Sequence, residues 1–270
     1  MDFVCPICKG ELTPTENLIK KCPLGHSFDR ARAGYYNLLV GQSGGTHGDN
    51  REMVDARRAF LSGDYYSPLA NRVAELALEH TEPLGTVLDI GCGEGYYSTR
   101  VASMLQKRDG THSLMAFDIS KDAVKRLLAR DKTICAAVAS AYDMPIATGT
   151  VDTALLVFSP LAREEIYRVL REDGKLIMVF PDVMHLYGLK EKIYDTPYKN
   201  KPEPTELSGF SLISDEALSY EITVEGEMIK NLFMMTPYAY RTSEANKARL
   251  FSNETITTEV AFRILVYRKV

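Results

Sequence analysis

This sequence of 270 residues has neither an excess of positive charge nor a long apolar run. Its formal net charge of -4 argues against a protein that coats nucleic acid nonspecifically, because such binding needs many Lys and Arg side chains to neutralise phosphates. No stretch approaches the apolar length that crosses a bilayer. The N-terminus lacks the basic start and the long apolar segment of a secretory signal. We therefore expect a cytoplasmic protein that does not contact a membrane.

Internal repeats and low-complexity tracts are also missing. Apolar residues make up 45% and charged residues 25% of the chain, as in an ordinary globular protein. The length suits one α/β domain of usual size and a small module at one end. The composition thus allows two folding units.

Cysteines are scarce, and three of the five lie within the first 22 residues. These three follow the pattern C-x2-C, a gap of thirteen residues, then C-x3-H, which supplies three thiolates and one imidazole as a full tetrahedral shell for Zn²⁺. A closed shell indicates a structural ion, because catalytic zinc keeps one position open for water. The alternative, a redox dithiol at the first pair, leaves the third cysteine and the histidine without a role. The predicted zinc ligands are Cys5, Cys8, Cys22 and His26.

The chain divides into three parts by composition. Residues 1–38 are too short to bury a core, so bound metal would supply much of the folding free energy of this module. Residues 39–50 include a run rich in Gly and Ser, which is typical of a linker. Residues 51–270 form the predicted larger domain.

Short apolar stretches alternate with segments of helical periodicity in the first half of that domain. Such alternation predicts a parallel, doubly wound α/β sheet. The last third contains two further segments with strand character, and we expect them to form an antiparallel pair that closes the sheet. The expected strands are 86–90, 113–118, 134–139, 153–158, 175–180, 219–224 and 257–267, and the expected helices are 53–61, 69–78, 97–105 and 121–130.

Three glycines at alternate positions, Gly91, Gly93 and Gly95, follow the first expected strand of this sheet. They let the backbone approach a ligand closely at the carboxyl edge of the sheet. The spacing differs from the dinucleotide fingerprint, whose third glycine comes one position later. Asp89 and Glu94 add negative charge, which would repel a pyrophosphate and attract a sulfonium group. The loop therefore favours S-adenosylmethionine over NAD.

Asp118 ends the second expected strand of the sheet. At that position a carboxylate can accept hydrogen bonds from the ribose hydroxyls of a nucleoside cofactor. The alternative role is a helix N-cap shared with Ser120. We include Asp118 among the predicted cofactor-binding residues because of its place in the pattern.

A mildly basic segment runs from His185 to Pro202. It carries four lysines against two acidic residues. Charge of this kind usually marks a solvated surface, so we expect an exposed loop here.

The residues between and beyond the two motifs form a long and specific pattern. On that pattern the chain resembles the 23S ribosomal RNA guanine-N1-methyltransferases of the RlmA type over nearly its whole length. The matching residues are Cys22-Pro23, His26, Phe28-Asp29, Ala31, Gly34-Tyr35, Asn37-Leu38-Leu39, Gly48-Asp49, Met53, Ala56-Arg57-Arg58, Phe60-Leu61, Tyr66, Pro68-Leu69, the segment from Asp89 to Tyr97, Asp118-Ile119-Ser120-Lys121, His185-Leu186 and Met235-Thr236-Pro237.

The resemblance implies a Rossmann-like class I methyltransferase fold with an antiparallel C-terminal strand, and a small N-terminal module similar to a zinc ribbon. It implies transfer of a methyl group from S-adenosylmethionine to N1 of a guanine in a hairpin of 23S ribosomal RNA, with one structural Zn²⁺ per chain. The module would help to grip the RNA, and two chains would form a homodimer. By the same similarity, Tyr66, Gly93, Glu94 and His185 match positions that contact the methyl donor.

The chain departs from that family in two segments. The family tends to carry a cysteine after the fourth strand and a tryptophan beside the Met-Thr-Pro motif, whereas this chain has Phe158-Ser159-Pro160 and contains no tryptophan. Every aromatic face can stack on a nucleobase. Tyr238 or Tyr240 is therefore a candidate substitute for the missing ring.

The N1 atom of guanine is buried in a Watson–Crick pair, so the target base must be unpaired or flipped. It must also lose its proton before or during transfer, and Asp182 and His185 are the candidates to assist. The sequence leaves two other functions open. One is a methyltransferase for a small molecule or a protein, with a purely structural zinc module. The other is a nonenzymatic RNA-binding protein, against which the intact glycines and acids of the cofactor loop weigh.

Overall fold

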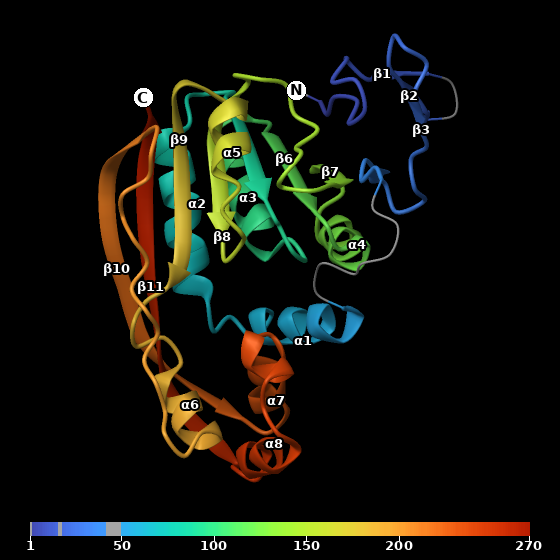
Figure 1. Ribbon diagram of the computed structural model, residues 1–270. Coiled ribbons are helices and arrows are strands. Elements are labelled where there is room, and N and C mark those ends of the chain that lie inside the picture. Colours follow the sequence, from blue (N-terminus) through green and yellow to red (C-terminus); the bar gives the residue numbers. More distant parts are fainter. Residues whose placement is uncertain (1, 16–17, 42–49) are drawn as a thin grey trace.

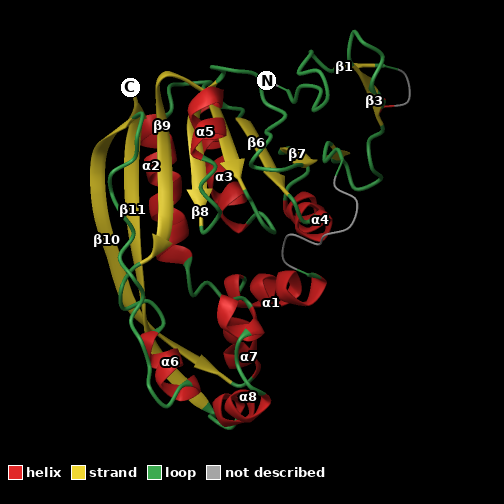
Figure 2. Cartoon of the chain, viewed as in Figure 1, coloured by secondary structure: helices red, strands yellow, loops and turns green. Residues whose placement is uncertain are grey.

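We describe residues 2–15, 18–41 and 50–270 of a computed structural model of the chain. An eight-stranded sheet forms its centre, and a small three-stranded sheet lies near the N-terminus (Figures 1 and 2). Most of the predicted linker, residues 42–49, lies outside the described residues. Within the described ranges, no helix is long and apolar enough to cross a membrane.

The large sheet has the strand order β10-β11-β9-β8-β5-β6-β7-β4. The strands from β4 to β9 in this sheet are parallel, and β11 runs antiparallel to both of its neighbours. The predicted doubly wound sheet with an antiparallel C-terminal strand is therefore confirmed. The order reverses between β5 and β8, where parallel sheets of this kind bind their ligands. The strands are β4 (Tyr36–Asn37), β5 (Thr86–Ile90), β6 (Ser113–Asp118), β7 (Cys135–Val138), β8 (Val151–Val157), β9 (Leu170–Pro181), β10 (Phe210–Glu225) and β11 (Thr255–Lys269).

The helices begin and end where the local sequence supplies caps. Asn50 accepts the N–H of Met53 at the start of α1, and Gly110 ends α3 in the left-handed conformation. The four predicted helices are present, and three of them extend further than predicted. Four more have only seven or eight residues, too few for periodicity to reveal them. The helices are α1 (Arg51–Leu61), α2 (Ser67–His80), α3 (Tyr96–Asp109), α4 (Lys121–Arg130), α5 (Arg163–Val169), α6 (Tyr187–Ile193), α7 (Glu227–Met234) and α8 (Glu244–Phe251).

Two hydrophobic clusters cover the two faces of the large sheet. Val87 and Leu88, neighbours in β5, belong to different clusters, because successive side chains of a strand point to opposite faces. α2, α3 and α4 pack against one face, and α5 packs against the other with residues of the N-terminal segment. α1, α6, α7 and α8 lie beyond the carboxyl ends of the parallel strands, below the sheet in Figure 1. These four helices therefore surround the edge where a ligand is expected.

The N-terminal module is a small antiparallel sheet of β1 (Thr13–Pro14), β2 (Lys20–Lys21) and β3 (Ser27–Phe28). It docks on the large sheet through backbone contacts. The N–H of Val4 donates to the carbonyl of Pro145 at 2.8 Å, and β4 pairs in parallel with β7. The last residues of the module thus supply an edge strand to the larger sheet. A domain boundary at residue 38 stays a prediction.

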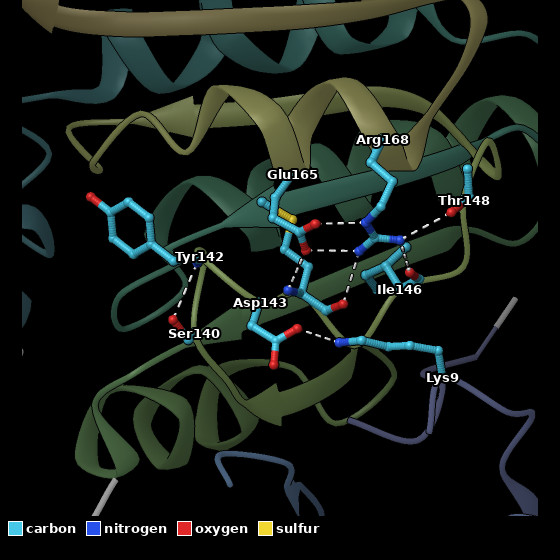
Figure 3. A network of polar contacts seen from close by, with 9 residues as sticks. Lys9, Ser140, Tyr142, Asp143, Ile146, Thr148, Glu165 and Arg168 are labelled. Atoms are coloured by element: carbon cyan, nitrogen blue, oxygen red, sulfur yellow. Dashed lines mark hydrogen bonds and ion pairs between the residues drawn. The ribbon is translucent and has the colours of Figure 1, made fainter. Parts of the chain in front are cut away.

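Arg168 in α5 organises the loop that receives the module (Figure 3). Its guanidinium donates to both carboxylate oxygens of Glu165, at 2.6 and 2.8 Å, and to the carbonyl of Met144 at 3.1 Å. Glu165 in turn accepts the N–H of Met144 at 2.6 Å. Asp143 in the same loop pairs with Lys9 of the module. This network ties the N-terminal module to α5.

Candidate functional site

The four predicted zinc ligands come together in the N-terminal module. Their ligand atoms all lie within 4.8 Å of one another. Cys8 Sγ lies 3.5 Å from Cys22 Sγ, and His26 Nδ1 lies 3.3 Å from Cys22 Sγ and 3.5 Å from Cys5 Sγ. A tetrahedral ion with Zn–S bonds of about 2.3 Å places its sulfurs roughly 3.8 Å apart. The donor set therefore fits Zn²⁺ in both chemistry and spacing.

Two tight turns hold these ligands in place. The N–H of Lys9 donates to the carbonyl of Cys5 at 2.8 Å, and the N–H of Gly25 donates to the carbonyl of Cys22 at 2.9 Å. Burial raises the pKa of the Cys22 thiol, but hydrogen bonds from Cys8 and from the backbone outweigh it and lower this pKa to about 6. A thiolate, the form that binds zinc, is thus favoured at neutral pH.

The loop after β5 requires its glycines. Gly91, Gly93 and Gly95 have φ values of +71°, +55° and +86°. Residues that carry a side chain rarely adopt such values. A Cβ atom on Gly91 would lie 2.1 Å from Ser159 Oγ, and one on Gly95 would lie 2.7 Å from Leu127 Cγ. The loop therefore packs closely on its neighbours at Gly91 and Gly95.

Two carboxylates fix this loop. Asp118 accepts the N–H of Gly93 at 2.9 Å and the N–H of Ser120 at 2.7 Å. Asp89 is buried and accepts the hydroxyl of Ser98 at 2.5 Å. Burial raises the pKa of Asp89 to about 6, because a low-dielectric site disfavours the charged form.

A cavity of about 410 Å³ opens beside the loop, within the range of roughly 300–1,000 Å³ typical of ligand sites. It lies at the carboxyl ends of β5, β8 and β9, and α1 and the 3₁₀ turn Pro237–Tyr240 also contribute to it. Its size, its two acids and its position at the strand reversal suit S-adenosylmethionine. The main lining residues are Arg57, Tyr66, Asp89, Gly91, Gly93, Glu94, Tyr97, Phe158, His185, Tyr198, Asn200, Tyr238 and Arg241.

Most of the predicted cofactor residues meet in this cavity. The lining includes Tyr66, Asp89, Gly91, Gly93, Glu94 and His185. Two others are not in the lining: Gly95 lies close to Leu127, and Asp118 accepts the N–H of Gly93. Asp182, one of the two base candidates, is not in the lining either; its Oδ1 accepts the N–H of Val183 at 2.7 Å.

His185 is buried and is part of the cavity lining. Its Nδ1 accepts the backbone N–H of Ala261 at 3.2 Å, so the neutral ring carries its proton on Nε2. Nε2 lies 3.4 Å from the hydroxyl of Tyr66. Burial lowers the pKa of His185 to about 3. The imidazole is therefore neutral at physiological pH, and its one N–H faces the hydroxyl of Tyr66, which also lines the cavity.

Glu94, which lies within the glycine loop, forms a buried ion pair with Arg130. Arg130 in α4 donates to its two carboxylate oxygens at 2.5 and 3.0 Å. The Glu94 side chain is 1% exposed and that of Arg130 is 20% exposed. This pair holds the loop against α4.

Aromatic side chains make up much of the remaining cavity lining. Phe158, directly after β8, has a φ of +54° and its ring is partly exposed; strain of this kind concentrates at functional sites. Of the two tyrosines predicted to stack on a base, Tyr238 lines the cavity. Tyr240 is 66% exposed and directs its hydroxyl to Met53.

The segment from His185 to Pro202 was expected to be a solvated loop, and this prediction was wrong in part. Its first half forms α6, and Tyr198 and Asn200 line the cavity. Lys190 is fully buried. Charge alone could not predict the burial of Lys190, because the residue type does not tell a buried lysine from an exposed one. The tyrosines in this segment, Tyr187, Tyr194 and Tyr198, were the available hint.

Comparison with protein families gives two matches along the chain. Residues 3–43 match the family described as RlmA, N-terminal. Residues 87–174 match the family described as Methyltransferase domain. The first match covers the zinc ligands, and the second covers the glycine loop and Asp118.

Curated relatives match along almost the full length. A protein of Micromonospora griseorubida, provisionally named a 23S rRNA (guanine-N(1)-)-methyltransferase, is 30% identical over 98% of this chain and 97% of its own. The 23S rRNA (guanine(748)-N(1))-methyltransferase of Streptomyces fradiae is 29% identical over 96% of this chain and 95% of its own. Among solved structures, a provisionally named methyltransferase of Bacillus halodurans has a TM-score of 0.49 and 16% identity, and covers 74% of this chain and 98% of its own.

Proposed function

The chain belongs to the family of RlmA-type 23S rRNA guanine-N1-methyltransferases, and from this premise we propose that its cavity joins a donor site to a base site. The enzyme uses S-adenosylmethionine and carries a zinc site in its N-terminal module. The donor would lie on the glycine loop between Asp89, Glu94 and Tyr66. The guanine would enter at the part of the cavity lined by Tyr198 and Tyr238. The continuous lining from the glycine loop to Tyr238 is the observation that carries this proposal.

The sheet sets the distance between these two ends. β5 carries the glycine loop, and β9, which leads to His185, is two strands away. Neighbouring strands lie about 4.8 Å apart, so the two strand ends are separated by roughly 10 Å. That span accommodates the reacting groups of two ligands within one enclosed space, where positioning is the main source of rate acceleration.

Bound S-adenosylmethionine supplies an electrophilic methyl group. N1 of guanine attacks the methyl carbon with an electron pair, the carbon–sulfur bond breaks with its electrons going to sulfur, and the N1 proton passes to water. His185 holds a proton on Nε2 and accepts a backbone N–H at Nδ1, so we propose that it donates a hydrogen bond to a ligand and does not act as the base. Asp182, outside the cavity lining, would position the segment that carries His185.

Positive side chains border the cavity, and one of them, Arg57, lies near Gly93 of the glycine loop. Arg57 and Arg241 are both part of the lining, and guanidinium groups bind phosphate and stack on bases. We propose that they guide the RNA backbone and that the zinc module grips a hairpin of the same RNA. By the family resemblance we also propose a homodimer, and action in the cytoplasm where ribosomal RNA is made. Light scattering of the purified chain tests the dimer.

The rival function is methyl transfer to a small molecule or a protein, with zinc serving only stability. Labelled S-adenosylmethionine offered with purified 23S RNA, 16S RNA or a protein extract separates the two. We expect label in 23S RNA alone. We also expect the full-length H26A variant to lose much of its RNA transfer, while its donor binding by calorimetry stays near that of the wild type. Label in protein or in a small molecule, with RNA unlabelled, would refute the proposal.

A further inference from the structure

Lys190 in α6 is a lysine with an exposed fraction of 0%. Its Nζ donates to the carbonyl of Tyr198 at 3.0 Å and to Oδ1 of Asn200 at 2.6 Å. Burying an ammonium group is costly, and both of these partners are neutral oxygens, which compensate less than a carboxylate does. Packing alone therefore does not explain why this position holds a charge.

Two aromatic rings complete the surroundings of this ammonium. Nζ lies 4.4 Å from the ring centroid of Tyr198 and 5.3 Å from that of Tyr238. Both distances are within the range of cation–π attraction. Both tyrosines also line the cavity, whereas Lys190 is not part of the lining. The charge thus lies behind two rings that border the cavity.

Asn200 connects this group to the rest of the site. Its Oδ1 accepts Lys190, and its Nδ2 donates to the carbonyls of Asp182 and His185 at 2.9 and 3.3 Å. Both the oxygen and the nitrogen of this amide are therefore hydrogen-bonded, and the nitrogen holds the backbone at Asp182 and at His185. One buried network links the His185 segment to the Tyr198 segment.

We infer that Tyr198 and Tyr238 form the stacking wall for the target guanine, and that Lys190 is the positioning residue that holds this wall and polarises it. The inference rests on the proposed function and specifies its base site. Each ring face carries negative charge density, and a cation on one side draws that density away from the other. The cavity side of each ring then suits an electron-rich purine.

The reaction adds a second reason for a cation at this place. As its proton leaves, N1 gains negative charge, which the guanine ring shares until the methyl group is attached. A buried ammonium one ring away favours that charge, because the interior screens it less than water does. Lys190 would therefore act on both binding of the base and the rate of transfer, without touching the methyl donor.

Four full-length variants test this inference. K190M removes the charge and keeps an unbranched side chain, K190R keeps the charge, and K192M alters an exposed lysine of the same helix as a matched control. Y198L removes one stacking ring from a side chain that is 52% exposed, so its fold is not at risk. The probes are S-adenosylmethionine alone, in calorimetry, and a 23S RNA hairpin, in steady-state and single-turnover methylation.

We expect K190M and Y198L to raise the KM for the hairpin about tenfold. K190M should also slow single-turnover transfer about tenfold. The affinity of both variants for the donor should stay within twofold of wild type. K190R should recover most of both losses, and K192M should match wild type. The inference would be overturned if donor affinity fell in parallel with the rate, or if K190M and Y198L had the kinetics of the wild type. Either result would leave the proposed function standing. A wild-type enzyme that methylates no RNA would overturn the proposed function and this inference with it.

Discussion

The backbone N–H of Ala261 in β11 donates a hydrogen bond to Nδ1 of His185 across 3.2 Å. A backbone amide can only donate, so this contact fixes which ring nitrogen carries the proton. The second nitrogen, Nε2, faces the Tyr66 hydroxyl at 3.4 Å. β11, the antiparallel strand of the sheet, thereby sets the chemistry of a side chain in the segment that follows β9.

Replacing His185 tests its role as a donor. H185Q keeps an N–H near the position of Nε2, whereas H185A removes it. We expect H185Q to bind S-adenosylmethionine within twofold of wild type and H185A to bind it about fivefold more weakly, because a lost hydrogen bond is worth about 1 kcal/mol. Calorimetry measures the affinities, and single-turnover rates show whether chemistry changes. If H185Q binds the donor normally but transfers no methyl group, His185 is the base after all.

The same residue makes stability depend on pH. Burial lowers the pKa of His185 to about 3, against an unfolded value of about 6.5. Between these values the unfolded chain binds a proton that the folded chain does not. His185 should therefore make the free energy of unfolding fall as pH drops below about 6.5, by up to about 1.4 kcal/mol per pH unit. We expect the free energy of unfolding, measured by denaturant titration at pH values from 4.5 to 7.5, to change less with pH for H185Q than for the wild type.

Breaking the ion pair of Glu94 and Arg130 should destabilise the fold. In R130M the Glu94 carboxylate, whose side chain is 1% exposed, loses its partner, and we expect a loss of about 3 kcal/mol. R126M is the matched control on the same helix, because its partner Asp55 is 45% exposed and such surface pairs contribute less than about 1 kcal/mol. Urea unfolding measures both. The double variant R130M/E94Q should recover part of the loss; equal losses in R130M and R126M would contradict this account.

Gly95 precedes α3 and Gly110 follows it. Alanine variants at these two positions distinguish the cost of backbone strain from the cost of steric overlap. Both have positive φ, +86° and +73°. A Cβ on Gly95 would also lie 3.0 Å from the backbone Cα of Leu127, whereas one on Gly110 meets nothing within 4 Å. We expect G110A to cost about 1 kcal/mol and G95A to cost at least twice as much while weakening donor binding. Thermal unfolding compares the two, and a G95A variant as stable as G110A would show that the loop can move.

The sequence predicted the parts of this enzyme that depend on local pattern. The strands 86–90 and 113–118 and the helix 121–130 have the predicted bounds, because buried strands and an amphipathic helix carry strong periodicity. The zinc ligands were predictable from spacing, since Cys and His at those intervals have few other uses. The lining residues of the glycine loop were also predictable from spacing, because glycines at alternate positions after a strand mark a ligand-binding loop.

The rest depends on contacts between distant segments, which no local pattern encodes. Lys190, Tyr198 and Tyr238 meet only because α6 and the turn after α7 fold over the same strand ends. The proton position on His185 depends on Ala261, 76 residues further along the chain. β10 begins at Phe210, nine residues earlier than predicted, because its first half is an edge segment with few fully buried side chains and a weak alternation.

The most direct test of the central claim is the identity of the modified atom. Unmodified 23S RNA is methylated with isotopically labelled S-adenosylmethionine, digested to nucleosides and analysed by mass spectrometry, and the position is mapped by reverse-transcription stops. The account predicts a single labelled N1-methylguanosine with a stop beside it, because a methyl group at N1 blocks Watson–Crick pairing. Label on another base or on another atom of guanine, or no label in the RNA, would contradict it.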